Sequence, residues 1–349
     1  MKRFLCLCLI LCLLLAGCEL GPSAPMEVPA DSEGLTVHFI DVGQADSILL
    51  QCDGANMLID GGNVEDSDLV VSYLQDQGVT YLDYVVNTHA HEDHVGGLAA
   101  VLAVYETGNV WCPVQEYDSK CFRDFVKYAN QQELELIYPA PGSRYALGSA
   151  TVTVLGPVED YTDTNNTSIV LKVTYGETSF LFTGDAESEA EKGILAAGYD
   201  VSATVLKVGH HGSETSSCYQ WIRAVAPKYA VISVGTGNSY GHPHEEPLSR
   251  FRDADAIVYR TDLQGHIVCQ SDGKTVAFTT EKEAAVTNPT AYDGSGQNAQ
   301  AEEFIGNVNS KKFHLPTCSG LPDEKNQVFF DSYDEAIEAG YSPCSRCIG

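Results

Sequence analysis

The sequence predicts a layered α/β sandwich. Short apolar runs bounded by glycine and aspartate, such as TVHFID, SILLQC and NMLID, have the length and composition of strands. Stretches with helical spacing of apolar residues, such as DLVVSYLQDQG, VGGLAAVLAVYE and ESEAEKGILAAG, lie between further strand-like runs. Strands that alternate with helices, together with strand meanders, indicate sheets covered by helices.

The N-terminus has the order of an export signal. Two basic residues precede an apolar run over 4–15, which is too short to span a bilayer comfortably, and LAGC ends at Cys18. This order resembles the lipobox of bacterial lipoproteins, which implies cleavage before Cys18, acylation of its thiol and anchoring at the extracytoplasmic face of the cell membrane. The alternative is a simple cleaved signal with a coincidental cysteine. We expect a signal peptide over 1–17 and a flexible tether over 18–33.

Composition divides the rest of the chain into a large domain over 34–280, a linker over 281–302 and a small unit over 303–349. The formal net charge is −28, from 48 acidic and 20 basic residues. Such a charge repels polyanions at long range and counts against a dedicated nucleic-acid binder. It leaves open a local site in which metal ions carry the positive charge.

The stretch THAHEDHVGG holds three of the ten histidines in the chain. His89 and His91 stand two positions apart at the end of an apolar strand, so in an extended chain both imidazoles point to the same side. Asp93 and His94 follow in the turn before a helix, where they can serve a second metal ion. The alternative is a chance cluster in a solvated loop. Histidine beside carboxylate suits zinc, manganese or iron.

Several ordered motifs identify a family. HFIDVGQADS, NNTSIVLKV, FLFTGD, LKVGHHGS and SVGTGNSYGHP resemble the metallo-β-lactamase fold and, more narrowly, the metallo-β-lactamase-like domain of the competence protein ComEC. The resemblance covers roughly residues 35–280 and implies an αββα sandwich with two divalent metal ions, zinc or manganese, along one edge. The implied ligands are His89 and His91 for the first metal, Asp93, His94 and His242 for the second, and Asp185 between them.

The same resemblance implies the catalytic residues. Asp93, besides its role as a ligand, is one of them. His210 and His211 would contact phosphate or transfer a proton, with one of the pair possible as a metal ligand instead. Lys207, next to this pair, is expected to contact a substrate phosphate.

Two residues are expected to support the ligands. Asp41 would orient a ligand histidine, as such imidazoles usually need. Asn166 lies where many hydrolases of this fold carry a further histidine, and no histidine stands between His94 and Asp185. The first metal is therefore expected to bind more weakly or to be a harder ion such as manganese.

The implied activity is hydrolysis of phosphodiesters, with DNA as substrate and partner, by a hydroxide that two metal ions activate. Hydrolysis of a lipid head group or a lactam, and a catalytically weak cell-surface protein that binds nucleic acid or another partner, stay open because a fold does not choose its substrate. The sequence leaves the oligomeric state open.

The C-terminal unit has the spacing of a tetrahedral zinc site. Its candidate ligands are His314, Cys318, Cys344 and Cys347. With SYDEAIEAGYSPCSRC, the unit resembles the zinc-binding module of the Ada DNA-repair protein. That family has a methyl-accepting cysteine where this chain has His314, so we expect one structural zinc ion and no methyl transfer. Free thiols or a disulfide are the alternative.

Overall fold

A computed structural model describes residues 34–284 and 304–348, with the exception of 317, 319, 331–332 and 345–346. The predicted signal peptide, the tether with Cys18, and most of the linker lie outside the described residues. Within the described part of the chain, no helix combines the length and apolar character needed to cross a membrane.

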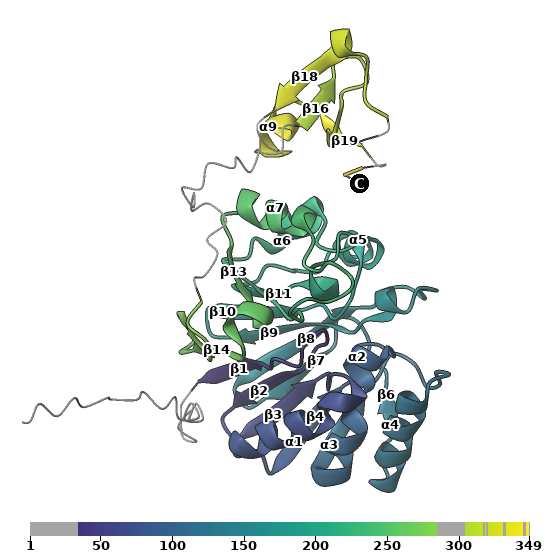
Figure 1. Ribbon diagram of the computed structural model, residues 1–349, viewed down its shortest axis with the longest axis vertical. Helices are drawn as coiled ribbons and strands as arrows, with labels where there is room; N and C mark the ends of the chain where they lie inside the picture. Colours follow the sequence, from purple (N-terminus) through teal and green to yellow (C-terminus); the bar gives the residue numbers. More distant parts are fainter. Residues whose placement is uncertain are drawn as a thin grey trace, which may run out of the picture.

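Two mixed β-sheets form the centre of the large domain (Figure 1). The strands of the first are β1 (Leu35–Phe39), β2 (Ile48–Cys52), β3 (Ala55–Ile59), β4 (Tyr81–Val86), β5 (Glu106–Trp111), β6 (Leu136–Ile137), β14 (Ile267–Ser271) and β15 (Val276–Thr280). The strands of the second are β7 (Arg144–Leu147), β8 (Ala150–Gly156), β9 (Val170–Tyr175), β10 (Thr178–Phe182), β11 (Val205–Lys207), β12 (Tyr229–Ile232) and β13 (Ile257–Arg260). The strand orders are β15-β14-β1-β2-β3-β4-β5-β6 and β13-β12-β11-β10-β9-β8-β7.

Helices cover the outer face of each sheet. The α-helices are α1 (Ser67–Asp76), α2 (Glu92–Val95), α3 (Leu98–Val104), α4 (Lys120–Gln131), α5 (Ser188–Ala196), α6 (Tyr219–Val225), α7 (Glu245–Asp253) and α8 (Thr261–Gln264). Short 3-10 turns are η1 (Val64–Asp66), η2 (Asn165–Thr167) and η3 (Gly209–Gly212). Apolar residues of α1, α3 and α4 pack on the first sheet, and those of α5, α6 and α7 pack on the second. The predicted αββα sandwich is confirmed.

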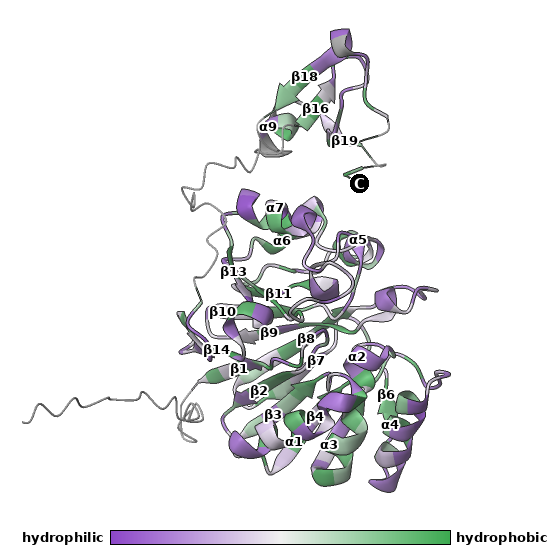
Figure 2. Cartoon of the chain, in the orientation of Figure 1, coloured by the Kyte–Doolittle hydropathy of each residue, from purple (hydrophilic) through white to green (hydrophobic). Residues whose placement is uncertain are grey.

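Apolar side chains pack on both faces of each sheet, because successive residues of a strand point to opposite faces. In β2, Ile48 and Leu50 lie in the cluster between the sheets, whereas Leu49 packs against the helices. In Figure 2 the strands are mainly hydrophobic, whereas the covering helices carry both hydrophobic and hydrophilic stretches. Because both faces of the sheets are buried, the strand sequences read as nearly continuous apolar runs.

The topology brings distant loops to one edge of the sandwich. β3, β4 and β5 are parallel neighbours in the first sheet, and β10, β11 and β12 are parallel neighbours in the second. Parallel strands end at the same edge, so the loops that follow them meet there. Glycine permits the close approach: a β-carbon at Gly97 would collide with the carbonyl oxygen of Gly61.

The C-terminal unit is a small α+β module. It contains β16 (Phe304–Asn307), β17 (Lys312–His314), η4 (Glu324–Asn326), β18 (Gln327–Phe330), α9 (Tyr333–Glu338) and β19 (Ser342–Pro343), with the strand order β18-β16-β17-β19. Its Phe304 ring packs edge-on against Tyr219 of α6, with ring centroids 5.5 Å apart.

Candidate metal centre

His89 and His91 form the first part of a candidate metal centre. Both follow β4, and the Nε2 atom of His89 lies 3.1 Å from the Nδ1 atom of His91. The Asp185 carboxylate, in the loop after β10, comes within 3.9 Å of the same His89 nitrogen. His89 and Asp185 are buried, which fixes their side chains in place.

A second group shares Asp185. Single ligand atoms of Asp93, His94, Asp185 and His211 all lie within 4.8 Å of one another. His94 Nε2 is 3.3 Å from Asp185 Oδ1, and His211 Nε2 is 3.2 Å from Asp93 Oδ2. Asp185 therefore lies between the two groups, where its two carboxylate oxygens can serve both.

The donor set fits divalent cations. Asp185 Oδ1 and His94 Nε2 are buried and have no hydrogen-bond partner among the described residues. Burial alone would raise the pKa of Asp185, but the imidazoles of His94 and His211 outweigh burial and hold that pKa well below its usual value. Burial would lower the pKa of His94, but the charges of Asp185 and Asp60 raise it well above its usual value. The carboxylates thus create a buried site that favours positive charge.

Backbone and carboxylate acceptors orient two of the imidazoles. Asp60, at the end of β3, accepts a hydrogen bond from His94 Nδ1 over 2.8 Å and another from the Thr88 hydroxyl over 2.7 Å. His211 Nδ1 donates to the carbonyl oxygen of Ser233 over 2.9 Å. In both rings Nε2 is left to face the shared carboxylates. Sequence reasoning missed Asp60, although the strand-ending motif LIDGG was visible.

Asp41 does not support a ligand histidine, which contradicts the prediction. Its backbone N–H donates to His266 Nδ1 over 2.9 Å, and its carboxylate lies 3.5 Å from Lys282 Nζ. The loop after β1 instead turns Asp46 toward the site, 3.6 Å from His211 Nδ1.

Asn166 lies near the site, but its side chain forms hydrogen bonds to the segment after Asp185. Its side-chain oxygen accepts from the N–H of Glu187 over 3.0 Å, and its nitrogen donates to Glu189 over 3.2 Å. These bonds anchor the loop after Asp185. The hydroxyl of Ser168, which accepts from the Asp185 N–H over 3.0 Å, lies 3.5 Å from His89 Nδ1.

Lys207 is unavailable to a substrate, and its predicted phosphate contact is contradicted. Its side chain is fully buried, with Nζ 2.7 Å from Asp46 Oδ2 and a hydrogen bond to the Val208 carbonyl over 2.9 Å. The ammonium neutralises the buried Asp46 carboxylate behind His211. Lys207 belongs to β11, whose residues are buried on both faces.

His210 and His242 lie at the rim of the centre. His210 Nε2 is 3.9 Å from Asp185 Oδ2, and its Nδ1 is 3.1 Å from the Glu187 carboxylate. His242 lies beyond it, with ring centroids 5.5 Å apart and Nδ1 3.3 Å from the Gln44 amide nitrogen. Burial and neighbouring imidazoles lower the pKa of His242 to about 4. His211 takes the position beside Asp93, His94 and Asp185 that the sequence analysis gave first to His242.

Comparison with known proteins agrees with this geometry. The family model of the metallo-beta-lactamase superfamily matches residues 40–236. This chain belongs to the metallo-beta-lactamase superfamily. A second model, the metal binding domain of Ada, matches residues 290–348. The large domain is thus that of a metal-dependent hydrolase, followed by an Ada-like module.

Its relatives include proteins of bacterial competence. ComE operon protein 3 of Bacillus subtilis is 30% identical over 68% of this chain and 33% of its own length. Competence protein ComA of Neisseria gonorrhoeae is 32% identical over 69% of this chain and 33% of its own length. The chain therefore spans about a third of the length of these relatives. The metallo-beta-lactamase fold protein YhfI of Bacillus subtilis aligns over 71% of this chain and all of its own, with 13% identity and a TM-score of 0.46.

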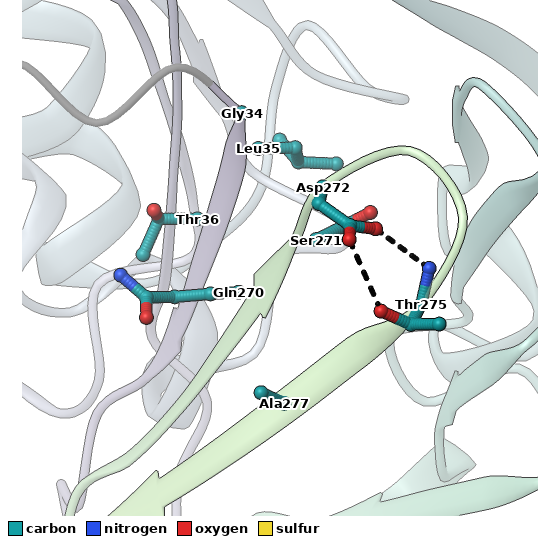
Figure 3. Close-up of a pocket in the computed structure, with 8 residues that line it drawn as sticks. All are labelled: Gly34, Leu35, Thr36, Gln270, Ser271, Asp272, Thr275 and Ala277. Atoms are coloured by element: carbon teal, nitrogen blue, oxygen red, sulfur yellow. Dashed lines mark hydrogen bonds between the residues drawn. The ribbon is translucent and has the colours of Figure 1, made fainter.

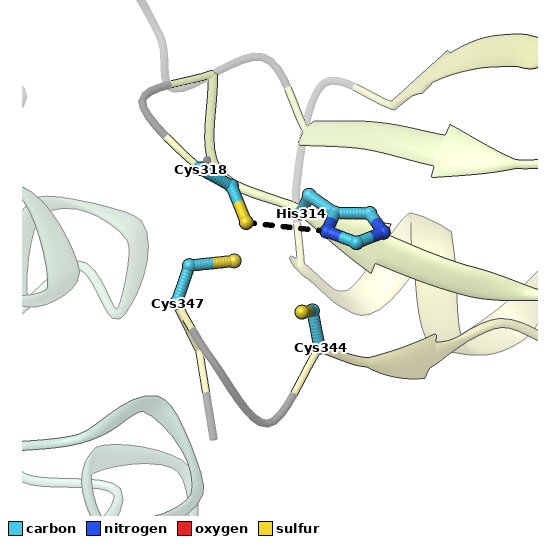
Figure 4. Close-up of side chains that lie close together, drawn as sticks. All are labelled: His314, Cys318, Cys344 and Cys347. Atoms are coloured by element: carbon cyan, nitrogen blue, oxygen red, sulfur yellow. Dashed lines mark hydrogen bonds between the residues drawn. The ribbon is translucent and has the colours of Figure 1, made fainter. Parts of the chain in front are cut away.

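The Ada-like module of this superfamily member holds a second candidate metal site. Ligand atoms of His314, Cys318, Cys344 and Cys347 lie within 4.8 Å of one another. Figure 4 shows the four side chains gathered around one point. His314 Nδ1 is 3.4 Å from Cys318 Sγ. Burial and the neighbouring thiols raise the pKa of Cys347 to about 12, so the thiol is neutral unless a cation compensates it. All four residues point at one centre, which fits a zinc ion.

Asp60→Asn is expected to weaken metal binding about 10- to 100-fold, because the amide no longer draws the proton of His94 Nδ1 as a carboxylate does. Titration of the apo-protein with Mn or Zn, followed by calorimetry, measures the change. Asp41→Asn is the matched control and should bind metal as the unmodified protein does, since Asp41 touches no ligand histidine. Equal losses in both variants would contradict the role given to Asp60.

Proposed function

We propose that this protein is a metal-dependent phosphodiesterase that acts on DNA. The observation that carries the proposal is the position of Asp185 between His89 on one side and the His94–His211 group on the other. Divalent cations held there would supply Lewis acidity and neutralise charge that develops on a phosphoryl group. Two divalent cations held by these residues would suit in-line displacement at phosphorus.

His210 is the proton donor in this proposal. Its Nδ1 faces the Glu187 carboxylate, which also accepts a hydrogen bond from the Thr215 hydroxyl over 3.0 Å. This carboxylate orients the ring. The Nε2–H of His210 is then directed past Asp185 toward the site, where it can protonate the leaving oxygen.

DNA is proposed as the substrate because the sequence motifs and the competence relatives point to the same domain, and because the metal site would concentrate positive charge in an otherwise acidic chain. Anchoring through the acylated Cys18 would place this site at the extracytoplasmic face of the membrane, where incoming DNA is found.

The substrate is tested by turnover of three compounds on the metal-loaded protein. We expect release of nitrophenol from bis-p-nitrophenyl phosphate and shortening of single-stranded DNA, both dependent on added Mn or Zn, and no opening of nitrocefin. Asp185→Asn should lose both phosphodiesterase activities together with bound metal, as measured by elemental analysis. Hydrolysis of nitrocefin alone would replace the proposal with a lactamase. Full metal occupancy with no turnover would indicate a binding protein.

A further inference from the structure

We propose that a pocket beside His91 binds one base of a single DNA strand next to the phosphate that is cleaved; this inference rests on the proposed function. The pocket has a volume of about 490 Å³ and is lined by residues 115–118 with Phe122, Arg123 and Val126. Its size lies within the range of small-ligand sites.

Tyr117 joins this pocket to the metal centre. Its ring centroid lies 6.3 Å from that of His91 and 6.1 Å from that of Phe122, near edge-to-face in both cases. The connection follows from topology, since Trp111 at the end of β5 pairs with Val86 at the end of β4. The loop that carries Tyr117 therefore leaves the sheet at the same edge as the loop that carries His91.

The walls of the pocket suit a planar base. Tyr117 is only partly buried, so part of the residue is accessible to a ligand. The ring of the buried Phe122 packs against the Tyr117 ring near edge-to-face. An aromatic face binds any base by stacking, without reading its sequence. This matches a hydrolase that must accept a strand of any sequence.

Helix α4 supplies the charge that a strand requires. Lys120, Arg123 and Lys127 are spaced by three and four residues and form one exposed face, opposite the buried Phe122 and Phe125. The helix holds three basic residues and one acidic residue, the reverse of the balance in the whole chain, 20 to 48.

The acidic partners of this basic face are weakly held. Lys120 pairs with Asp124 over 2.6 Å and Arg123 with Asp118 over 2.8 Å. The two basic side chains are 86% and 61% exposed, and exposed ion pairs contribute little, so phosphates can replace the carboxylates. The strand would run from the metal centre over Tyr117 and along α4.

Two other pockets lie away from the metal centre. The pocket in Figure 3, about 230 Å³, lies where β1 begins, at the opposite end of that strand from the metal centre, and no basic side chain lines it. A pocket on the outer face of the second sheet has the basic Arg144 and Lys172 and the aromatic Tyr199, but it lies where β10 begins, at the opposite end of that strand from Asp185.

The test combines variants of Tyr117 with DNA that lacks bases at chosen positions. Manganese-loaded full-length protein is assayed on a single-stranded oligonucleotide and on the same oligonucleotide with abasic positions. Loss of the bases should lower kcat/KM about ten-fold for the unmodified protein. Tyr117→Ala should lose about the same factor on normal DNA and respond little to the abasic change. Tyr117→Phe, which keeps the aromatic ring, should retain the response to the abasic change, and elemental analysis should show equal metal in all three proteins.

The basic face is tested separately by salt dependence. Lys120→Gln should reduce the slope of binding affinity against salt, whereas Lys274→Gln, an exposed lysine in the turn between β14 and β15, should not. An equal abasic effect in Tyr117→Ala and unmodified protein would overturn the subsite and leave the phosphodiesterase proposal standing. Absence of DNA cleavage by the unmodified protein would overturn both.

Discussion

Replacing His211 with alanine is expected to remove about one metal ion per chain and to lower phosphodiester hydrolysis at least about a hundred-fold. The His211 imidazole lies 3.2 Å from Asp93 and 3.6 Å from Asp185, and its other nitrogen is fixed by a backbone carbonyl. Alanine removes one of the two imidazoles, those of His94 and His211, that face the Asp93 and Asp185 carboxylates. Metal content by elemental analysis, measured beside turnover, records both losses.

His242→Ala is the matched control for this prediction. The ring lies at the rim, 6.4 Å from that of His211 between centroids, and it is only partly buried. We expect the variant to keep its metal ions and to lose turnover far less than His211→Ala. If His242→Ala lost the metal and His211→Ala kept it, the sequence-based choice of His242 would be restored.

Lys207→Met is expected to lower the free energy of unfolding by about 3–5 kcal/mol. The methionine fills a similar volume, so the principal loss is the ammonium that faces Asp46 over 2.7 Å in a fully buried position. The carboxylate then remains buried without its counter-charge. Guanidinium unfolding of metal-free proteins measures this stability without a contribution from metal binding.

Two further variants isolate the buried pair. Lys172→Met removes a lysine from a pair in which Asp200 is 76% exposed, and we expect a loss of about 1 kcal/mol or less. Adding Asp46→Asn to Lys207→Met should recover much of the lost stability, because the uncompensated charge is gone. A Lys207→Met protein with normal stability and reduced affinity for DNA would return Lys207 to the role of a phosphate contact.

Much of the architecture and of the metal chemistry could be predicted from local patterns. Apolar runs of strand length, helical spacing and the glycine-rich turns are properties of short segments, so they can be read without the fold. The residues His89, His91, Asp93 and His94 fall within six consecutive positions, in the loop after β4 and in α2, and this is why the cluster is visible in the sequence. The cysteine spacing of the C-terminal module is visible for the same reason.

Local sequence patterns were sufficient to predict the layered α/β class, the histidine cluster over 89–94 and the four candidate zinc ligands of the C-terminal module. These features depend on residues that are neighbours along the chain. The tertiary structure was needed to show that Asp60 rather than Asp41 hydrogen-bonds to a candidate ligand histidine. It was also needed to show that His211 contacts Asp93 and that Lys207 is buried. Those contacts join residues that are 34 to 225 positions apart in the chain. Spacing in sequence carries no information on such pairs, since strand order and register set which loops meet at the edge of the sandwich.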